Sequence, residues 1–296
     1  MAIDFLFLMW YNISVKEYYA FRRQLMKVEV KTPEQQRAEI LAKIPDFRLM
    51  DDTYMSAFFN GRKDLIQFIL RIIMNDDKLV VKNDKTQKVL KNLQGRSITL
   101  DVDTLLNGDR EADVEVQQES SGAKPKRARF HSSMMDSNSL LPGEDFEKLR
   151  ETYVIFITSH DYFGKGLPIY TIDRYIKELD MMPFDDKEHI IYVNGENNAD
   201  TPLGKLMHDF KCNDPKDMYY KNLAERADHL KNTEGGREEM CKIMEEIKSE
   251  GVRQEKYQIA INLLKMGIAS DEQISQATGL TIEEVQALSA MVKTSA

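Results

Sequence analysis

The stretch SITLDVDTLLNGDREADVEVQQ, residues 97–118, decides the fold predicted for this chain. Its two ends alternate between apolar and acidic or polar side chains, which is the period of a half-buried β-strand. Leu100 and Val102 therefore share one face of the first strand, and Val114 and Val116 share one face of the second. The opposite faces carry Asp101, Asp103, Asp113, Glu115 and Gln117. We predict a β-hairpin with one apolar and one acidic face.

The turn decides whether the two acidic faces coincide. A two-residue turn would pair Asp101 with Val114 and would put the carboxylates on opposite sides of the sheet. A three-residue loop at residues 107–109 pairs Asp101 with Glu115 instead and gathers the valines on one side. The apolar pattern favours the second register, so we predict a three-residue loop or an equivalent bulge.

Carboxylates that face one another across two strands repel each other unless a positive charge lies between them. Like charges directly opposite each other destabilise a sheet by roughly 0.2–1 kcal/mol. A hard divalent cation such as Mg²⁺, or Mn²⁺, removes this repulsion, because it prefers oxygen ligands and accepts carboxylates, water and a substrate phosphate together. The composition leaves an equally good alternative, which is a solvated acidic face without a ligand.

A basic cluster follows the second strand at once. Lys124, Lys126, Arg127 and Arg129 lie in a segment with helical spacing that begins near Pro125. Beside a metal site, these side chains would hold the phosphates of a nucleic acid backbone, so DNA is the expected partner. The alternatives are a solvated helix start or a run that mimics a nuclear-localisation signal.

The composition is that of an ordinary globular protein. The chain has 296 residues, a formal net charge of −8 and two cysteines, Cys212 and Cys241, without metal-binding spacing. This charge argues against a protein that coats nucleic acid non-specifically, but it is compatible with a local basic patch. The apolar run at residues 5–11 is too short to cross a bilayer and lacks the flanks of a signal peptide. We expect reduced thiols, a cytoplasmic location and no membrane contact.

The remaining patterns predict an α/β fold. Two continuous apolar runs, residues 152–158 and 189–195, are typical of strands that are buried on both faces. A segment after Pro45 has helical spacing, with Asp51 or Asp52 as the N-cap and a break at Asn60 and Gly61. Together with the hairpin and the basic helix, these elements predict a mixed sheet that is flanked by helices.

The end of the chain is predicted to form two short helices. Ser270 with Gln273 and Thr281 with Glu284 match capping boxes, and Gly279 is placed to end the first helix. The arrangement resembles a helix-turn-helix, but this segment lacks Lys and Arg, so contact with DNA phosphates would be repulsive. We expect a small element that serves either packing within the chain or oligomerisation, and the second alternative would give a homo-oligomer through the C-terminal helices.

Three regions are therefore predicted. Residues 1–39 are an N-terminal extension without an assigned role, residues 40–235 are the α/β domain, and residues 236–296 are a helical tail. Gly235 and Gly236 are expected to interrupt the helical pattern at this last boundary.

The order of these parts is similar to that of a known family. The segments concerned are MDD (50–52), LQGRSITLDV (93–102), VEVQ (114–117), KRARFHSSMMDSN (126–138), ETYVIFIT (151–158), GKGLPIYTIDR (164–174) and HIIYVNG (189–195). Over residues 40–242, the chain resembles the transposases of the PD-(D/E)xK nuclease family, which are allied to the bacterial recombination-promoting nucleases. The resemblance implies a restriction-endonuclease-like fold and a Mg²⁺-dependent DNA endonuclease linked to transposition or recombination.

The resemblance also implies roles for single residues. Asp101 and Glu115 would be the catalytic acids and the metal ligands, with the backbone carbonyl of Val116 as a further ligand. Asp52 or Asp51 would supply another acidic group. The reaction implied is hydrolysis of a phosphodiester by a metal-activated water.

One position departs from the family pattern. Gln117 stands where the nuclease motif has a lysine two residues after the glutamate. Its amide can orient a water but cannot neutralise a phosphate or accept a proton. Lys124 and Lys126 are candidates for a lysine that comes from elsewhere. His131, one helical turn after Arg127, could touch substrate, although a lone histidine on a helix is more often a satisfied surface or core residue.

The missing lysine and the short hairpin permit a second hypothesis. The chain could be a catalytically inactive nuclease-like fold that binds DNA or a partner protein without cutting.

Overall fold

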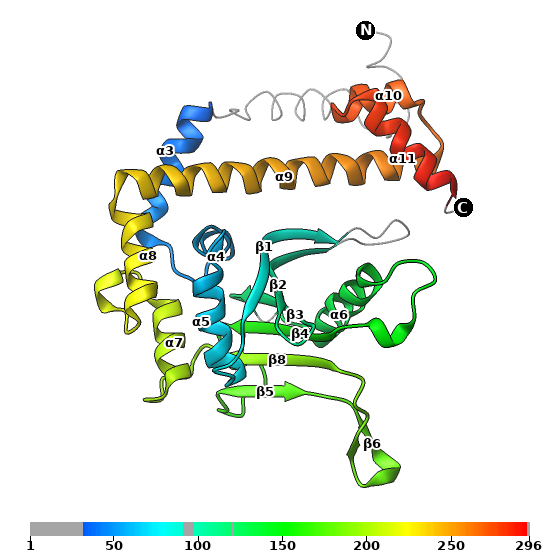
Figure 1. Ribbon diagram of the computed structural model, residues 1–296. Helices are drawn as coiled ribbons and strands as arrows, with labels where there is room; N and C mark the ends of the chain where they lie inside the picture. Colours follow the sequence, from blue (N-terminus) through cyan, green and yellow to red (C-terminus); the bar gives the residue numbers. More distant parts are fainter. Residues whose placement is uncertain (1–31, 91–97, 120, 295–296) are drawn as a thin grey trace, which may run out of the picture. The chain divides into compact units, whose positions relative to one another are not determined.

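The computed structural model describes residues 32–90, 98–119 and 121–294 (Figure 1). The chain divides into two compact units, residues 1–43 and 44–296. The described part of the first unit contains α3 (Pro33–Lys43). Most of the predicted N-terminal extension, including the apolar run at residues 5–11, lies outside the described residues. No helix in the described part of the chain is both long and apolar enough to cross a membrane.

A six-stranded mixed sheet forms the centre of the second unit. Its strands are β1 (Val81–Leu90), β2 (Ile98–Leu106), β3 (Arg110–Gln117), β4 (Glu151–Thr158), β5 (Ile169–Ile172) and β8 (Glu188–Asn194), in the spatial order β1-β2-β3-β4-β8-β5. The strands β1, β2 and β3 are antiparallel, β3, β4 and β8 are parallel, and β5 is antiparallel to β8. The predicted α/β fold with a mixed sheet is confirmed, and β1 and β5 extend it beyond the strands that were predicted.

The hairpin has the predicted register. Val102 pairs with Val114, and residues 107–109 form the loop between β2 and β3. Gly108 and Asp109 both have positive φ, at 74° and 57°, a conformation that glycine and aspartate adopt more readily than most residues. The three-residue loop is therefore confirmed, and it turns the acidic side chains of both strands to one face.

Both faces of the sheet are buried. The helix α6 (Pro125–Ser139) packs on the face that carries Val154 and Phe156 of β4. Ile155 and Ile157 alternate with these residues, face the other way and are also fully buried. The central strands are thus covered on both sides, as their continuous apolar sequence predicts.

Two helices precede the sheet in the chain. They are α4 (Asp52–Phe59) and α5 (Lys63–Met74), which are separated at Gly61 as predicted. Both contact β1. Figure 1 shows them with α7 (Pro202–Lys211) on the left of the sheet and α6 on its right.

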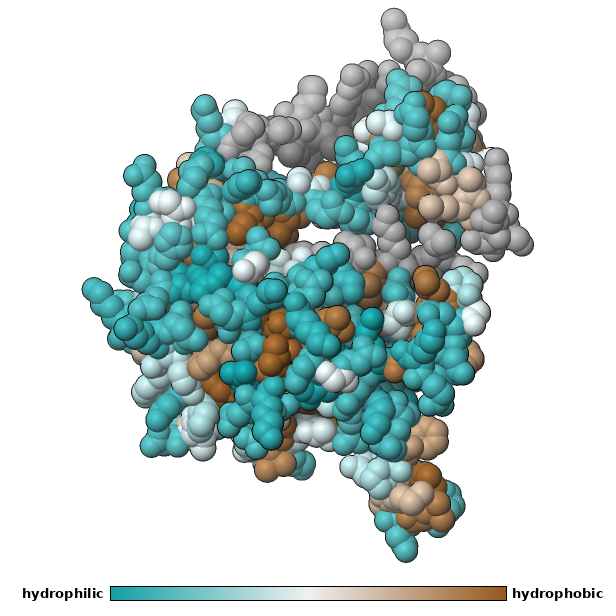
Figure 2. Space-filling model, viewed as in Figure 1, coloured by the Kyte–Doolittle hydropathy of each residue, from teal (hydrophilic) through white to brown (hydrophobic). Residues whose placement is uncertain are grey.

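A small second sheet projects from the domain. It consists of β6 (Tyr175–Ile176) and β7 (Met182–Pro183), joined through η3 (Lys177–Leu179). Met181 and Phe184 are exposed apolar residues of this element, which is the brown tip at the lower end of Figure 2. This tip is apolar, whereas most of the surface around it is hydrophilic.

The end of the chain is helical. After α8 (Lys221–Asn232), the long helix α9 (Glu234–Met266) carries α10 (Asp271–Thr278) and α11 (Ile282–Thr294), which pack against it and against each other. A small apolar core joins the three last helices, formed by Ala260, Ile274, Leu280 and Val285. The predicted helical tail is therefore confirmed.

The predicted helix caps are present. Ser270 and Gln273 make both hydrogen bonds of a capping box, and Thr281 and Glu284 do the same before α11. Gly279 ends α10 in the left-handed conformation.

The predicted interruption of the helical pattern is present, but it lies at Thr233 between α8 and α9, and Gly235 and Gly236 are in the first turn of α9. A Cβ at Gly236 would lie 1.9 Å from the carbonyl oxygen of His229. The glycine therefore serves the close approach of α8 and α9, and it does not break a helix.

Arg226 of α8 ties three helices together. Its side chain is buried, and its Nε and Nη2 donate to the carbonyls of Phe58 (3.1 Å) and Ala57 (3.3 Å) at the end of α4. Its two terminal nitrogens also donate to the carboxylate of Glu239 in α9, at 3.1 and 2.7 Å. Carbonyls at a helix end lack partners within the helix, so the guanidinium satisfies groups that would otherwise be buried unpaired.

Replacing Arg226 with leucine is expected to lower the free energy of unfolding by about 3 kcal/mol, because two buried carbonyls and a carboxylate lose their donor. Urea unfolding followed by circular dichroism measures the change. Lys221→Leu, at an exposed position of the same helix, is the control and should alter this free energy by less than about 0.5 kcal/mol. Equal losses in the two variants would contradict the role of Arg226.

Candidate metal centre

Five carboxylates line one face of the hairpin. All five residues are buried, and the exposed fraction of Asp113 and of Glu115 is 0%. The set consists of Asp101, Asp103, Glu111, Asp113 and Glu115. The solvated acidic face that the composition allowed is therefore wrong, and the reason is that α6 covers this part of the sheet.

The helix α6 supplies two partners for this acidic row. Arg127 Nη2 donates to Glu115 Oε2 at 2.9 Å. His131 Nδ1 lies 2.9 Å from Asp113 Oδ2 and 3.7 Å from Glu115 Oε1. Residues four apart lie on the same face of a helix, so the spacing of Arg127 and His131 aims both of them at β3.

The hydrogen bonds define the protonation of His131. Arg127 Nε donates to His131 Nε2 at 3.2 Å, so Nε2 is an acceptor. The ring proton is then on Nδ1, which donates to Asp113. His131 is thus a neutral, buried link between Arg127 and Asp113. It is a core residue with satisfied hydrogen bonds, and it is not placed for direct contact with substrate.

Asp101 and Glu115, the predicted metal ligands, lie together. The backbone N–H of Asp101 donates to Glu115 Oε1 at 3.1 Å. Burial raises the pKa of Asp101 well above its usual range, and the carboxylates of Glu115, Asp52 and Asp113 raise it further. Asp52 is therefore close enough to act electrostatically on this pair, although it is itself exposed.

Asp51 has a different environment from Asp52. Its carboxylate accepts the backbone N–H of Arg48 at 2.7 Å and a hydrogen bond from the side chain of Gln118. Asp52 is the one of the two that lines the cleft described below. Of the two alternatives that the resemblance offered for a further acid, the geometry favours Asp52.

The other end of the acidic row is balanced by two cations. Lys88 Nζ lies 2.7 Å from Asp103 Oδ2 and 3.4 Å from Glu111 Oε1. Arg150 Nη1 lies 3.2 Å from Glu111 Oε2. With Arg127, three cations face five carboxyl groups, so two of these groups have no cation to balance them when all five are ionised.

Two carboxyl groups in the middle of the row are only partly compensated by donors. Asp103 and Asp113 are direct cross-strand partners, and Oδ1 of each is buried without a hydrogen-bond partner. Burial raises the pKa of both, that of Asp103 to about 6. The ligand atoms of Asp113, Glu115 and His131 lie within 4.8 Å of one another, and this buried group could hold a metal. Orphaned oxygens and carboxyl groups in excess of the nearby cations fit a hard divalent cation.

An open cleft of about 360 Å³ lies at the C-terminal end of β3. Asp52, Val116, Gln117 and Arg127 line it. Glu115 lies behind two of these residues, because it accepts hydrogen bonds from Arg127 and from Gln117 Nε2 (3.4 Å). Among the described residues that line the cleft, Arg127 is the cation, beside the carboxyl groups of Asp52 and Glu119.

Gly122 leaves room for the amide of Gln117 because it has no Cβ. A Cβ at Gly122 would lie 1.8 Å from Gln117 Oε1, so any larger residue would displace the amide. Arg127 Nη1 donates to the same oxygen at 3.3 Å. The amide is therefore held between the backbone of Gly122 and the guanidinium.

Arg127 is the member of the basic cluster that reaches this centre. Lys124, Lys126 and Arg129 are exposed on α6 and its N-cap. The interpretation of Lys124 or Lys126 as the substitute for the missing lysine is therefore not supported, since the cation beside Gln117 is Arg127. The signal in the sequence was the four-residue spacing of Arg127 and His131, which becomes informative once the acidic face of β3 is known.

Comparisons with known proteins identify no relative. No family model, no curated protein and no solved structure matches the chain. The class of protein is therefore defined by the geometry alone, as an α/β protein with a buried acidic centre behind an open cleft.

Asp113→Asn is expected to raise the free energy of unfolding by about 1 kcal/mol in EDTA at neutral pH, because it removes one of two facing carboxylates. The pKa of Asp113 is raised in the folded state, so the stability present at low pH is lost as the pH rises and the group ionises. The amide oxygen can still accept the N–H of His131. Thermal unfolding should show a rise of about 2–4 °C.

The control for this prediction is Glu147→Gln, at an exposed position. It should leave the midpoint unchanged. A lower midpoint for Asp113→Asn would show that the buried carboxylate stabilises the metal-free fold.

Proposed function

We propose that the protein is a metal-dependent endonuclease that hydrolyses phosphodiester bonds in DNA, with a fold of the restriction-endonuclease type. The observation that carries this proposal is the pair Asp101 and Glu115 on adjacent strands, held together behind a cleft that Gln117 and Arg127 line. The resemblance to the PD-(D/E)xK transposases supports the same activity and a role in transposition or recombination.

Asp101 and Glu115 are the proposed ligands of Mg²⁺ or Mn²⁺, together with the carbonyl of Val116. All three offer hard oxygen atoms, which these ions prefer. Both ring nitrogens of His131 are engaged by protein groups, so its proposed task is to position Asp113 and Arg127. When bound, the ion would activate a water and stabilise the negative charge that develops on the phosphate.

The protein's own groups have separate tasks beside the ion. The amide of Gln117 orients the attacking water. Arg127 presents a planar pair of donors to the phosphate, a geometry in which guanidinium groups excel. Arg127 thus supplies the positive charge that a lysine at position 117 would supply, but it remains protonated and cannot act as a base. Asp52 adds a carboxylate at the cleft.

The DNA backbone is proposed to follow the start of α6. Lys124, Lys126 and Arg129 are exposed there, and the N–H groups of a helix N-terminus also favour phosphate. Contacts of this kind give affinity without sequence preference and weaken with salt. A homo-oligomer through α10 and α11 stays a prediction, and it would allow two cuts.

The ion pair of Arg127 and Glu115 favours a second candidate function. At 2.9 Å, a cation already neutralises the glutamate that the metal would need. A fold that keeps this pair permanently would bind DNA or a partner protein without cutting. The inactive nuclease-like fold is therefore the alternative that an experiment must exclude.

Purified protein is expected to nick supercoiled plasmid with Mg²⁺ or Mn²⁺ and to stop when EDTA is added. Asp101→Asn and Glu115→Gln should each lower the rate by about 10²-fold or more, because each removes a proposed metal ligand. Gel separation of supercoiled and nicked plasmid measures the rate. Glu225→Gln, at an exposed site on α8, is the matched control. Wild type that binds this DNA but never nicks it would establish the inactive alternative.

Arg127→Ala is expected to lower the nicking rate by about 10²-fold, because the phosphate loses its preorganised donor. Arg129→Ala is the control two residues along, and it should weaken DNA binding in a salt-dependent way with little change in the rate at saturating DNA. Adding Gln117→Lys to Arg127→Ala should recover part of the rate by restoring a positive charge. Equal losses for Arg127→Ala and Arg129→Ala would refute the special role of Arg127.

A further inference from the structure

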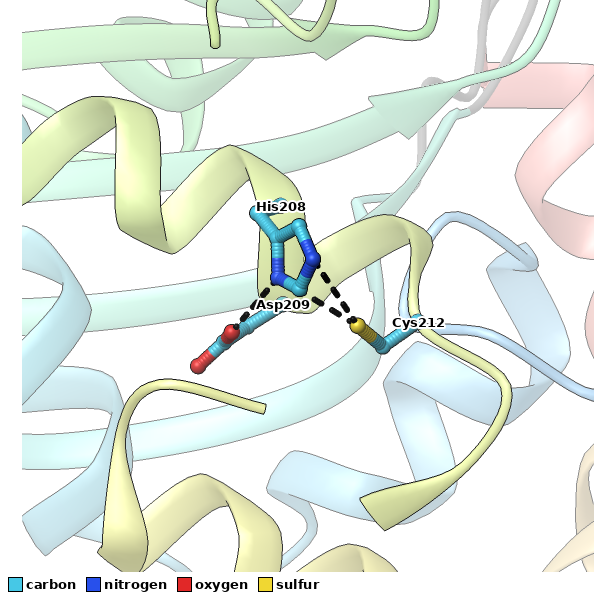
Figure 3. A group of neighbouring side chains, drawn as sticks. All are labelled: His208, Asp209 and Cys212. Carbon is cyan, nitrogen blue, oxygen red and sulfur yellow. Dashed lines mark hydrogen bonds and ion pairs between the residues drawn. The ribbon is translucent and has the colours of Figure 1, made fainter. Parts of the chain in front are cut away.

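A second group of ligand-type side chains lies at the C-terminal end of α7 (Figure 3). Cys212 Sγ is 3.4 Å from Nδ1 and 3.8 Å from Nε2 of His208. Asp209 Oδ1 is 3.3 Å from the same Nδ1. Figure 3 shows the imidazole between the carboxylate and the thiol. The three side chains thus meet at one point outside the acidic centre.

The backbone holds this group in place. His208 and Cys212 are four residues apart, so the helical spacing brings their side chains together. Asp209 is fully buried, and its two oxygens accept the backbone N–H groups of Tyr219 (2.7 Å) and Tyr220 (2.8 Å). A carboxylate that is fixed by two amides keeps further lone pairs for another partner. The carboxylate of Asp209 is therefore a fixed oxygen ligand beside the imidazole and the thiol.

The distances match those between ligands of a tetrahedral ion. With zinc bonds of about 2.0 Å to nitrogen or oxygen and about 2.3 Å to sulfur, a nitrogen and a sulfur ligand lie about 3.5 Å apart, and a nitrogen and an oxygen ligand about 3.3 Å apart. The observed separations are 3.4 Å from His208 Nδ1 to Cys212 Sγ and 3.3 Å to Asp209 Oδ1. The side chain of His208 is partly exposed, so water can reach the site and fill the fourth position.

The charges around the thiol also favour a cation. The last carbonyls of a helix carry partial negative charge, and Cys212 is the C-cap of α7. The carboxylates of Asp209, Asp217 and Asp214 act electrostatically on Cys212, and their negative charge would attract a metal ion, which displaces the thiol proton on binding.

We infer that His208, Asp209 and Cys212 form a binding site for a borderline divalent ion, zinc above all, with three protein ligands and one open position. Thiolate and imidazole ligands bind such ions in preference to Mg²⁺. The ligands proposed on the hairpin are all oxygen atoms, and these suit Mg²⁺ instead. All three ligands lie at the end of α7, and Asp209 also joins this end to the segment that leads into α8 by accepting the N–H groups of Tyr219 and Tyr220. This inference is independent of the proposed nuclease activity.

Cobalt titration of the metal-free full-length protein tests the site. Co²⁺ occupies tetrahedral zinc sites, and a cysteine ligand then produces thiolate-to-cobalt charge-transfer absorption. One equivalent of Co²⁺ should produce this absorption, and one equivalent of Zn²⁺ should abolish it, whereas excess Mg²⁺ should not. Cys212→Ser should remove the absorption, and His208→Gln should weaken Co²⁺ binding by about tenfold or more.

Two further variants are matched controls. Cys241→Ala removes the other cysteine, which is buried in α9, and Glu115→Gln alters the acidic centre. Both should keep the full absorption, and circular dichroism should show that all four variants are folded. The site is refuted if saturating Co²⁺ produces no charge-transfer absorption in wild type or if Cys212→Ser retains it.

Discussion

The burial of the acidic row on β2 and β3 is the constraint on which the rest of the structure depends. Carboxylates can leave water only where cations and hydrogen-bond donors replace it. The helix α6 meets this need through Arg127 and His131, while Lys88 of β1 and Arg150 beside β4 meet it at the other end. The position of α6 on the sheet is therefore determined by charge as well as by its apolar contacts, and the cleft exists because α6 lies there.

Cations and hydrogen-bond donors compensate the buried carboxyl groups of this row only in part, and the proposed function explains why. A row kept for stability alone would gain from an amide in place of one carboxylate. In the proposed enzyme, Arg127 and the metal ion both need Glu115, so they compete while the cleft is empty. A phosphate in the cleft would give Arg127 a new partner and free the glutamate. Metal and DNA would then strengthen each other's binding, as linkage requires.

The sequence predicted best the features that depend on near neighbours. The alternation and the loop length were enough for the pairing of Val102 with Val114, because a slip of one residue would put the valines of the two strands on opposite faces of the sheet. The strand β1 reads VKNDKTQKVL and lacks such a pattern; it is a strand because it pairs with β2. The burial of the acidic face and the choice of Arg127 over Lys124 depend on how α6 is rotated against the sheet, which no local pattern determines.

The close contact between Gln117 and Gly122 couples the residue types that fit at these two positions. A Cβ at position 122 would occupy the space of the glutamine amide, and a longer side chain at position 117 would have to lie outside this space. Substitutions at the two positions should therefore be correlated during evolution, so that a relative with lysine at the first would carry a reshaped turn as well. The pattern E-x-Q-x4-G, residues 115–122, is accordingly a more selective search pattern for this arrangement than the glutamate and glutamine alone.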